Sequence, residues 1–353
     1  MPFSIFKVIV PLILTFIIGI SITPFFSGVM YHFRLWKRSA RGNKKENPEI
    51  SDAFVKIHND SSEISTPRIG GVIIWVAVLI TVMMLWIAPQ VVSSDFLSRL
   101  DFMSRSQTWI PVAALIIASL VGLVDDLLQV FGKGLAIIDG LTRLQRIVLV
   151  ALMGFGVGWW FFEKLSITSI SIPFMESLTL GWLMIPFIVI VMLATFSGGV
   201  IDGIDGLSGG VLASAFASFA MIAFLQNQID IAALSAAITG GILAFLWFNI
   251  PPARFYMGET GMMGLTVTLT IIAFLTDQVL LLIIIAFPLV ITSASVIIQK
   301  LSRKFRNGKR VFTVAPLHHH FQAHGWSSEK VTMRYWIISL VCALAGVIIA
   351  LIG

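Results

Sequence analysis

Long apolar runs separated by short polar segments dominate this sequence. Ten of the runs approach the length of about 20 residues that a helix needs to cross a bilayer. They lie near residues 6–28, 69–89, 108–124, 145–162, 179–197, 207–226, 229–248, 261–276, 278–299 and 334–352. We therefore expect an all-α, polytopic membrane protein with ten transmembrane helices, built as a single integral-membrane domain over residues 1–353.

Composition supports the same fold class. Of the 353 residues, 57% are hydrophobic and 12% are charged, whereas soluble domains carry roughly 25% charged residues. This argues against a soluble enzyme, a nucleic-acid-binding domain or a disulfide scaffold, and the single cysteine, Cys342, has no partner. The first run is too long for the apolar core of a signal peptide, and no A-x-A-like cleavage site follows it. We expect it to remain as a helix.

Lysine and arginine lie mainly on alternate loops. Twenty of the 24 basic residues fall in one set of loops, and the opposite set holds only Lys7, Arg99, Arg105 and Lys164. The basic set comprises residues 29–68, 125–146, 198–206, 249–260 and 300–334. Because cytoplasmic loops carry such an excess, we expect these loops in the cytoplasm, both termini outside, and a multi-pass protein of the inner (cytoplasmic) membrane.

The net charge of +6 then lies where anionic headgroups and anionic substrates would meet it. We expect contact with membrane lipid, and the run from Arg303 to Arg310 to lie beside the membrane. Nucleic acid is not an expected partner, since no aromatic-interleaved recognition pattern accompanies the charges.

The acidic residues cluster at cytoplasmic helix ends. None of the 18 lies in the middle of an expected span, where ion-coupled transporters usually place ionisable groups. Instead Asp125 and Asp126 close one span, Asp202 and Asp205 follow another, and Glu259 precedes a third. Like charges at low-dielectric helix ends need a compensating cation. Oxygen ligands of this type suit Mg²⁺, which binds one or two carboxylates together with substrate phosphates.

Each acidic motif also has a plainer interpretation. Asp125 and Asp126 point about 100° apart on a helix, so one could bind metal or polarise a nucleophile while the other holds a helix end or a basic partner. A solvated end of the helix is the alternative. In "FSGGVIDGIDGLSGG", Asp202 and Asp205 share a face if the turn is helical, and a simple Gly/Asp connector is the alternative.

Two further segments carry candidate chemistry. "NIPPARFYMGETGMMG" places Glu259 among glycines and brings Phe255 and Tyr256 to the membrane edge, where aromatic residues also serve as ordinary interfacial anchors. "VFTVAPLHHHFQAHGW" carries four histidines, which are His318, His319, His320 and His324. Consecutive histidines point in different directions, and no Cys or acidic ligand lies near them in sequence. A phosphate-binding role therefore fits better than zinc, with a His-rich surface turn as the alternative.

Together these motifs resemble one family. The ordered set, from "STPRIGG" at 65–71 to "GKRVFTVAPLHHHFQAHGW" and "VTMRYWIISL", is similar to the polyprenyl-phosphate N-acetylhexosamine-1-phosphate transferases. The "PLHHHF" motif looks most like the branch whose donor is UDP-MurNAc-pentapeptide. That resemblance implies a Mg²⁺-dependent enzyme that transfers phospho-MurNAc-pentapeptide from its UDP conjugate to undecaprenyl phosphate. The products would be UMP and lipid I, the latter for peptidoglycan synthesis.

A homodimer is one assembly that we expect. The resemblance also implies roles for individual residues. The implied catalytic residues are Asp125, Asp126, Asp202, His319 and His320. The implied residues for substrate binding are Asp205, Asn249, Tyr256 and His318, and those for metal binding are Glu259 and Asp202. The expected substrates are undecaprenyl phosphate and a UDP-linked amino sugar.

This chain departs from the family pattern at four positions, and the mildest change is Tyr256 in place of the usual aromatic residue of "FMGD". Glu259 replaces the usual Asp of "FMGD", Gly199 replaces an Asn, and Arg68 is a feature of the branch that uses UDP-GlcNAc. A related transferase with such a donor is therefore a second hypothesis. An inactive or transport-like membrane protein is a third.

The loop charges generate a topological prediction. In a variant without Cys342, cysteines introduced near Lys44 and Arg306 should resist membrane-impermeant thiol reagents in intact cells and react after lysis, because both loops belong to the basic set. Labelling of either site from outside would reverse the orientation.

Overall fold

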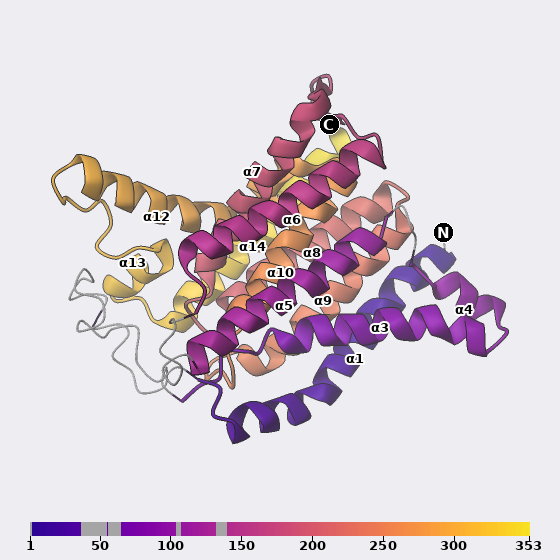
Figure 1. Ribbon diagram of the computed structural model, residues 1–353, viewed down its shortest axis with the longest axis horizontal. Helices are drawn as coiled ribbons and strands as arrows, with labels where there is room; N and C mark the ends of the chain where they lie inside the picture. The colour runs from indigo at the N-terminus through magenta and orange to yellow at the C-terminus, as the bar shows by residue number, and fades with distance from the viewer. Residues whose placement is uncertain (1, 37–54, 56–64, 104–106, 132–139) are drawn as a thin grey trace.

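The computed structural model describes residues 2–36, 55, 65–103, 107–131 and 140–353. This part of the chain is helical apart from a short antiparallel hairpin, in which Ser169–Ile170 (β1) pairs with Leu178–Thr179 (β2). The longer helices form one bundle (Figure 1). They are α1 (Pro2–His32), α3 (Val72–Val91), α5 (Trp109–Phe131), α6 (Arg143–Glu163), α7 (Met184–Ser197), α8 (Leu207–Leu225), α9 (Ile229–Asn249), α10 (Gly258–Leu275), α12 (Phe287–Phe305) and α14 (Ser328–Ile352).

Shorter helices connect these elements. They are α4 (Asp95–Leu100), α11 (Leu282–Ile285), α13 (Leu317–Ala323) and the 3₁₀ turns η3 (Gly181–Leu183), η4 (Gly198–Ile201) and η5 (Val279–Leu281). In the described residues, nine helices are long and apolar enough to cross a membrane, and a bent pair makes a tenth candidate. The expected all-α, multi-pass membrane fold is therefore confirmed.

The ends of several helices differ from the expected spans, and two of the differences are larger. Residues 278–299 are expected to form one span, but the chain bends by 82° between 279–285 and 287–305. Pro288 lies in the first turn of α12, where its missing amide is tolerated, so a new helix can start there in a new direction. The second difference is α5, which continues to Phe131, well beyond the expected end at 124.

The centre of the bundle consists of α8, α9 and α10, which bury most of their residues, whereas α1 and α14 bury few. Small residues permit close helix crossings there. A Cβ added at Gly264 of α10 would lie 2.0 Å from Ser119 Oγ of α5, and one at Gly240 of α9 would lie 2.1 Å from the Leu12 carbonyl of α1. Close backbone approach through glycine is a common way to pack membrane helices, because lipid supplies no hydrophobic force between them.

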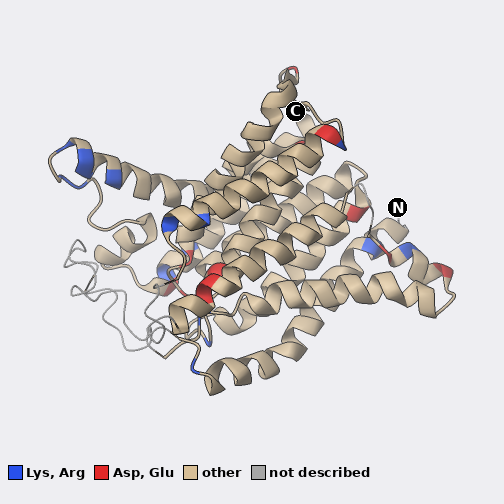
Figure 2. Cartoon of the chain, viewed as in Figure 1, with Lys and Arg blue, Asp and Glu red and all other residues tan. Residues whose placement is uncertain are grey.

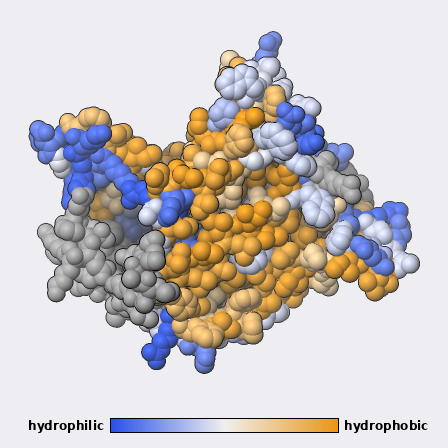
Figure 3. Space-filling model, viewed as in Figure 1, coloured by the Kyte–Doolittle hydropathy of each residue, from blue (hydrophilic) through white to orange (hydrophobic). Residues whose placement is uncertain are grey.

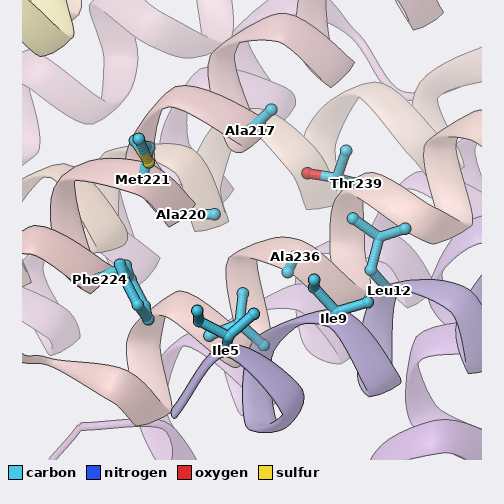
Figure 4. Close-up of a pocket in the computed structure, with 10 residues that line it drawn as sticks. Ile5, Ile9, Leu12, Ala217, Ala220, Met221, Phe224, Ala236 and Thr239 are labelled. Carbon is cyan, nitrogen blue, oxygen red and sulfur yellow. The ribbon is translucent and has the colours of Figure 1, made fainter. Parts of the chain in front are cut away.

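Apolar side chains cover the flank of the bundle, and hydrophilic residues gather towards its ends (Figure 3). One hollow of about 260 Å³, with a mainly apolar wall, lies between α1, α8 and α9 (Figure 4). Its wall includes Ile5 near the start of α1 and Phe224 near the end of α8. The acidic loop with Asp202 and Asp205 precedes the start of α8, whereas Phe224 lies near its end. The hollow is therefore separate from the acidic motifs.

The α5–α10 crossing generates a stability prediction. Gly264→Ala should lower the free energy of unfolding by about 1–3 kcal/mol, because the added methyl group overlaps Ser119. Gly156→Ala in α6 is the matched control. No atom lies within 4 Å of its added Cβ, so we expect no loss and a gain of up to about 1 kcal/mol from helix propensity. Thermal unfolding in detergent measures both, and equal effects would contradict the packing argument.

Candidate active site

The N-terminus of α10 is the point at which the acidic segments meet. Asp126 of α5 accepts hydrogen bonds from the amides of Glu259 (3.1 Å) and Thr260 (2.9 Å). Asp202 accepts one from the Gly258 amide at 3.1 Å. The first amides of a helix have no partner within the helix, and its dipole favours negative charge at this end. Two carboxylates from distant parts of the chain therefore hold three successive amides.

Asp125 and Asp126 point in different directions, as their adjacency predicts. Asp125 is fully buried, accepts the Leu141 amide at 2.5 Å, and lies 3.2 Å from Nε of Arg146. Asp126 is also buried. Asp125 therefore holds a basic partner, and Asp126 holds the N-terminus of α10. The alternative interpretation, that the pair forms a solvated end of α5, is wrong.

Arg146 forms ion pairs with two carboxylates of this acidic cluster. Its Nη1 lies 2.6 Å from Glu259 Oε1 while its Nε contacts Asp125, so it links α5 to α10. The position of Arg146 in the first turn of α6 is set by a capping box between Thr142 and Gln145. Sequence reasoning required a compensating cation but did not identify this one.

The Gly-rich loop turns its two aspartates apart. Asp202 accepts a hydrogen bond from Ser208 Oγ (2.9 Å), and Asp205 accepts one from the Ala253 amide (3.0 Å). The turn between them is not helical, so the shared face that helical spacing would give does not occur. Burial raises the pKa of Asp205 above its ordinary value, and the Ala253 hydrogen bond offsets part of the rise.

Asn249 connects this loop to the segment before α10. Its Oδ1 accepts the Gly206 amide at 3.0 Å, and its Nδ2 donates to the Phe255 carbonyl at 2.8 Å. Gly206 has a φ of +74°, a conformation that suits glycine. The side chain of Asn249 is buried. The structure thus gives Asn249 a clamping role, and its contact with a nucleotide stays a prediction.

The two aromatic residues before α10 differ in accessibility. Phe255 is fully buried against Phe245 and Phe248, so it has no face available for a ligand. Tyr256 is partly exposed, and its backbone pairs with the 65–71 segment through the Pro67 carbonyl and the Gly70 amide, each at 2.8 Å. Of the two rings, Tyr256 alone could stack on a base.

The histidine motif forms α13 and packs on the Gly-rich loop. A Cβ at Gly203 would lie 2.7 Å from His318 Nε2 and 3.0 Å from His319 Nε2, so only glycine lets the two rings approach the loop this closely. His320 is held differently, because its Nδ1 accepts the Thr313 amide at 3.2 Å. Burial, with a smaller contribution from nearby His324, lowers the pKa of His320 and favours the neutral ring that this hydrogen bond requires.

A cavity of about 430 Å³ adjoins the acidic cluster. Its walls come from α6, α7, η4, α10 and α12, and its charged lining consists of Arg143, Arg146, Lys300 and Glu259. Most of the remaining wall is apolar, and Gly199 contributes to it. A Cβ at Gly199 would have Met262 as its nearest neighbour, at 3.7 Å, so this part of the wall has room for a side chain. Glu259 and Gly199, two of the positions at which we expect departures from the family pattern, therefore border one cavity.

The carboxylates surround the α10 N-terminus without forming a ready-made metal cage. Within the described parts of the chain, no three His, Cys, Asp or Glu side chains are disposed to hold a metal ion. Asp125 and Asp126 are engaged with protein donors, and Asp202 lies beside Glu259 through its bond to Gly258. An all-oxygen pair of this kind fits Mg²⁺ when a substrate diphosphate supplies further ligands.

The clamp generates a prediction for Asn249. Asn249→Ala should lower the free energy of unfolding by about 1–3 kcal/mol for each buried backbone group that it leaves unpaired. Asn249→Asp is the sharper variant, since it keeps an acceptor for Gly206 and places a second acceptor against the Phe255 carbonyl. Thermal unfolding without ligand is the measurement. Wild-type stability in both variants would refute the clamp.

The sequence is similar to that of known proteins. Residues 108–277 match the model of glycosyl transferase family 4. Three similar proteins are each named phospho-N-acetylmuramoyl-pentapeptide-transferase. The relative from Listeria monocytogenes is 35% identical over 87% of this chain and 90% of its own length. That from Halalkalibacterium halodurans is 34% identical over 95% and 96%, and that from Anoxybacillus flavithermus is 34% identical over 95% and 95%. The chain belongs to glycosyl transferase family 4.

Proposed function

We propose that this protein transfers phospho-MurNAc-pentapeptide from its UDP conjugate to undecaprenyl phosphate, forming lipid I and releasing UMP for peptidoglycan synthesis. Membership of the family implies polyprenyl-phosphate and UDP-sugar substrates in general. The finer assignment is supported by the "PLHHHF" motif and by the names of the full-length relatives. The observation that carries the proposal is the meeting of acidic residues, histidines and a basic cavity at one end of α10.

The proposed reaction needs alignment and charge neutralisation more than covalent help from the protein. An oxygen of the lipid phosphate attacks the sugar-bearing phosphorus of the donor, and the bond from that phosphorus to the oxygen of the leaving UMP breaks. Arg143, Arg146 and Lys300 line the cavity and suit the negative charge of the two phosphate-bearing substrates. The apolar walls suit a prenyl chain that stays in the membrane.

We further propose a place for the metal and for the nucleotide. Asp202 and Glu259 would hold Mg²⁺, which supplies neutralisation of the diphosphate charge when bound. His318 and His319 adjoin the Gly-rich loop beside Asp202 and would orient the diphosphate. His320 would help to position these two residues through its hydrogen bond with the Thr313 amide. Asp205 and Tyr256 would bind the nucleotide. Asp125 and Asp126 would act on the reaction by holding Arg146 and the α10 amides.

The decisive experiment measures UMP release. Purified protein with Mg²⁺ and undecaprenyl phosphate should release UMP from UDP-MurNAc-pentapeptide. UDP-GlcNAc is the comparison donor, because Arg68 favours that branch. Preference for UDP-GlcNAc would transfer the assignment to the second hypothesis, and no release from either donor would support an inactive or transport-like protein.

The shared cavity wall generates a double-mutant prediction. We expect Glu259→Asp and Gly199→Asn each to lower the rate of UMP release, and the double variant to recover much of the loss, because both residues line one cavity and a shorter carboxylate would leave room for an Asn side chain. The coupling should amount to about 0.5–3 kcal/mol. Independent gains from the two single changes would instead identify both positions as lesions.

A further inference from the structure

The second half of α12 carries an exposed apolar stripe. After the 82° bend, the helix leaves the bundle and extends away from it, at the left of Figure 1. Ile297, Leu301 and Phe305 follow one another at intervals of four residues, so they share a face. Their exposed fractions are 54%, 49% and 73%. A stripe of this kind on a membrane protein meets lipid.

The same segment is strongly basic. Between residues 287 and 310 there are six cations and no carboxylate. The cations are Lys300, Arg303, Lys304, Arg306, Lys309 and Arg310. All residues from 303 to 310 are exposed, and the basic residues gather at the outer tip of the helix (Figure 2), where the surface is hydrophilic (Figure 3). An apolar stripe that ends in a basic tip is typical of helices that lie at an anionic membrane surface.

We propose that residues 301–310, the α12 tip, form a docking surface for anionic phospholipids. The apolar stripe would lie among acyl chains, and the cations would contact lipid phosphates at the headgroup level. Charge complementarity selects an anionic lipid surface over a second copy of this chain, whose α12 tip would carry the same positive charge. Binding strength should then depend on anionic lipid content and on salt.

The docking surface is linked to the histidine motif. The Gln299 side chain bonds both backbone groups of Phe312, accepting its amide at 3.0 Å and donating to its carbonyl at 2.8 Å. Ser295 accepts the Leu317 amide, at the start of α13, at 2.9 Å. Because α12 thus holds both ends of the segment that leads into α13, docking of the tip on lipid stabilises the helix that bears the histidines.

A fluorescence experiment in single-copy nanodiscs tests the docking. A Cys342→Ser, Val311→Cys protein carries a polarity-sensitive dye next to the tip. The emission should shift to the blue as phosphatidylglycerol is added to phosphatidylcholine discs, and salt should reverse the shift. Arg306→Gln with Lys309→Gln should weaken the response by about fivefold for each neutralised cation. Arg99→Gln with Lys164→Gln, which removes two charges from the opposite loop set, should leave it unchanged.

Three results would overturn the proposal. The first is a blue shift in pure phosphatidylcholine discs as large as that with phosphatidylglycerol. The second is an equal loss of the emission shift in the two double variants. The third is a shift that appears only when a disc holds two copies, which would identify the tip as a contact between chains. Hydrogen exchange over residues 311–323 tests the link to α13. Exchange should slow when phosphatidylglycerol is present, and neither measurement requires an active enzyme.

Discussion

The site depends on the unsatisfied amides at the start of α10. A helix that begins within a bundle, away from bulk water, needs acceptors for these groups, and each group left unpaired costs free energy. Asp126 and Asp202 supply the acceptors from α5 and from the Gly-rich loop. Gly258 allows the approach, because its φ is +70° and a Cβ there would lie 1.9 Å from the Arg68 carbonyl. One helix end thereby fixes the relative positions of three segments that are far apart in sequence.

This arrangement concentrates negative charge, and Arg146 offsets part of it. Buried carboxylates are stable when they are paired and fully hydrogen-bonded. Asp125 meets this condition through Arg146 and the Leu141 amide, whereas Glu259 is partly open to the cavity. Glu259 is therefore the carboxylate whose partner can change. Glu259 is held by one ion pair at the cavity wall, whereas Asp126 is held by two backbone amides.

Local patterns sufficed to predict most of the fold and part of the site. The runs near 207–226 and 229–248 match α8 and α9 within a residue or so, because hydropathy alone marks a lipid-length helix. The bend before Pro288 was missed, since a proline in a first turn leaves the apolar run unbroken. The roles of Arg146 and Asn249 were missed for another reason. The partners Arg146 and Glu259 are 113 residues apart, and no local pattern encodes such a pairing.

The departures of this chain from its family follow from the same geometry. A carboxylate at position 259 must reach Arg146 across the cavity wall, and the extra methylene of Glu extends that reach by about 1 Å, a distance that matters in an active site. The observed Nη1–Oε1 distance is 2.6 Å, so the longer side chain completes the ion pair. A side chain at position 199 would project into the same cavity, where glycine leaves room. Glu259 and Gly199 thus border one cavity, and a longer side chain at either position would leave less of that volume for a substrate.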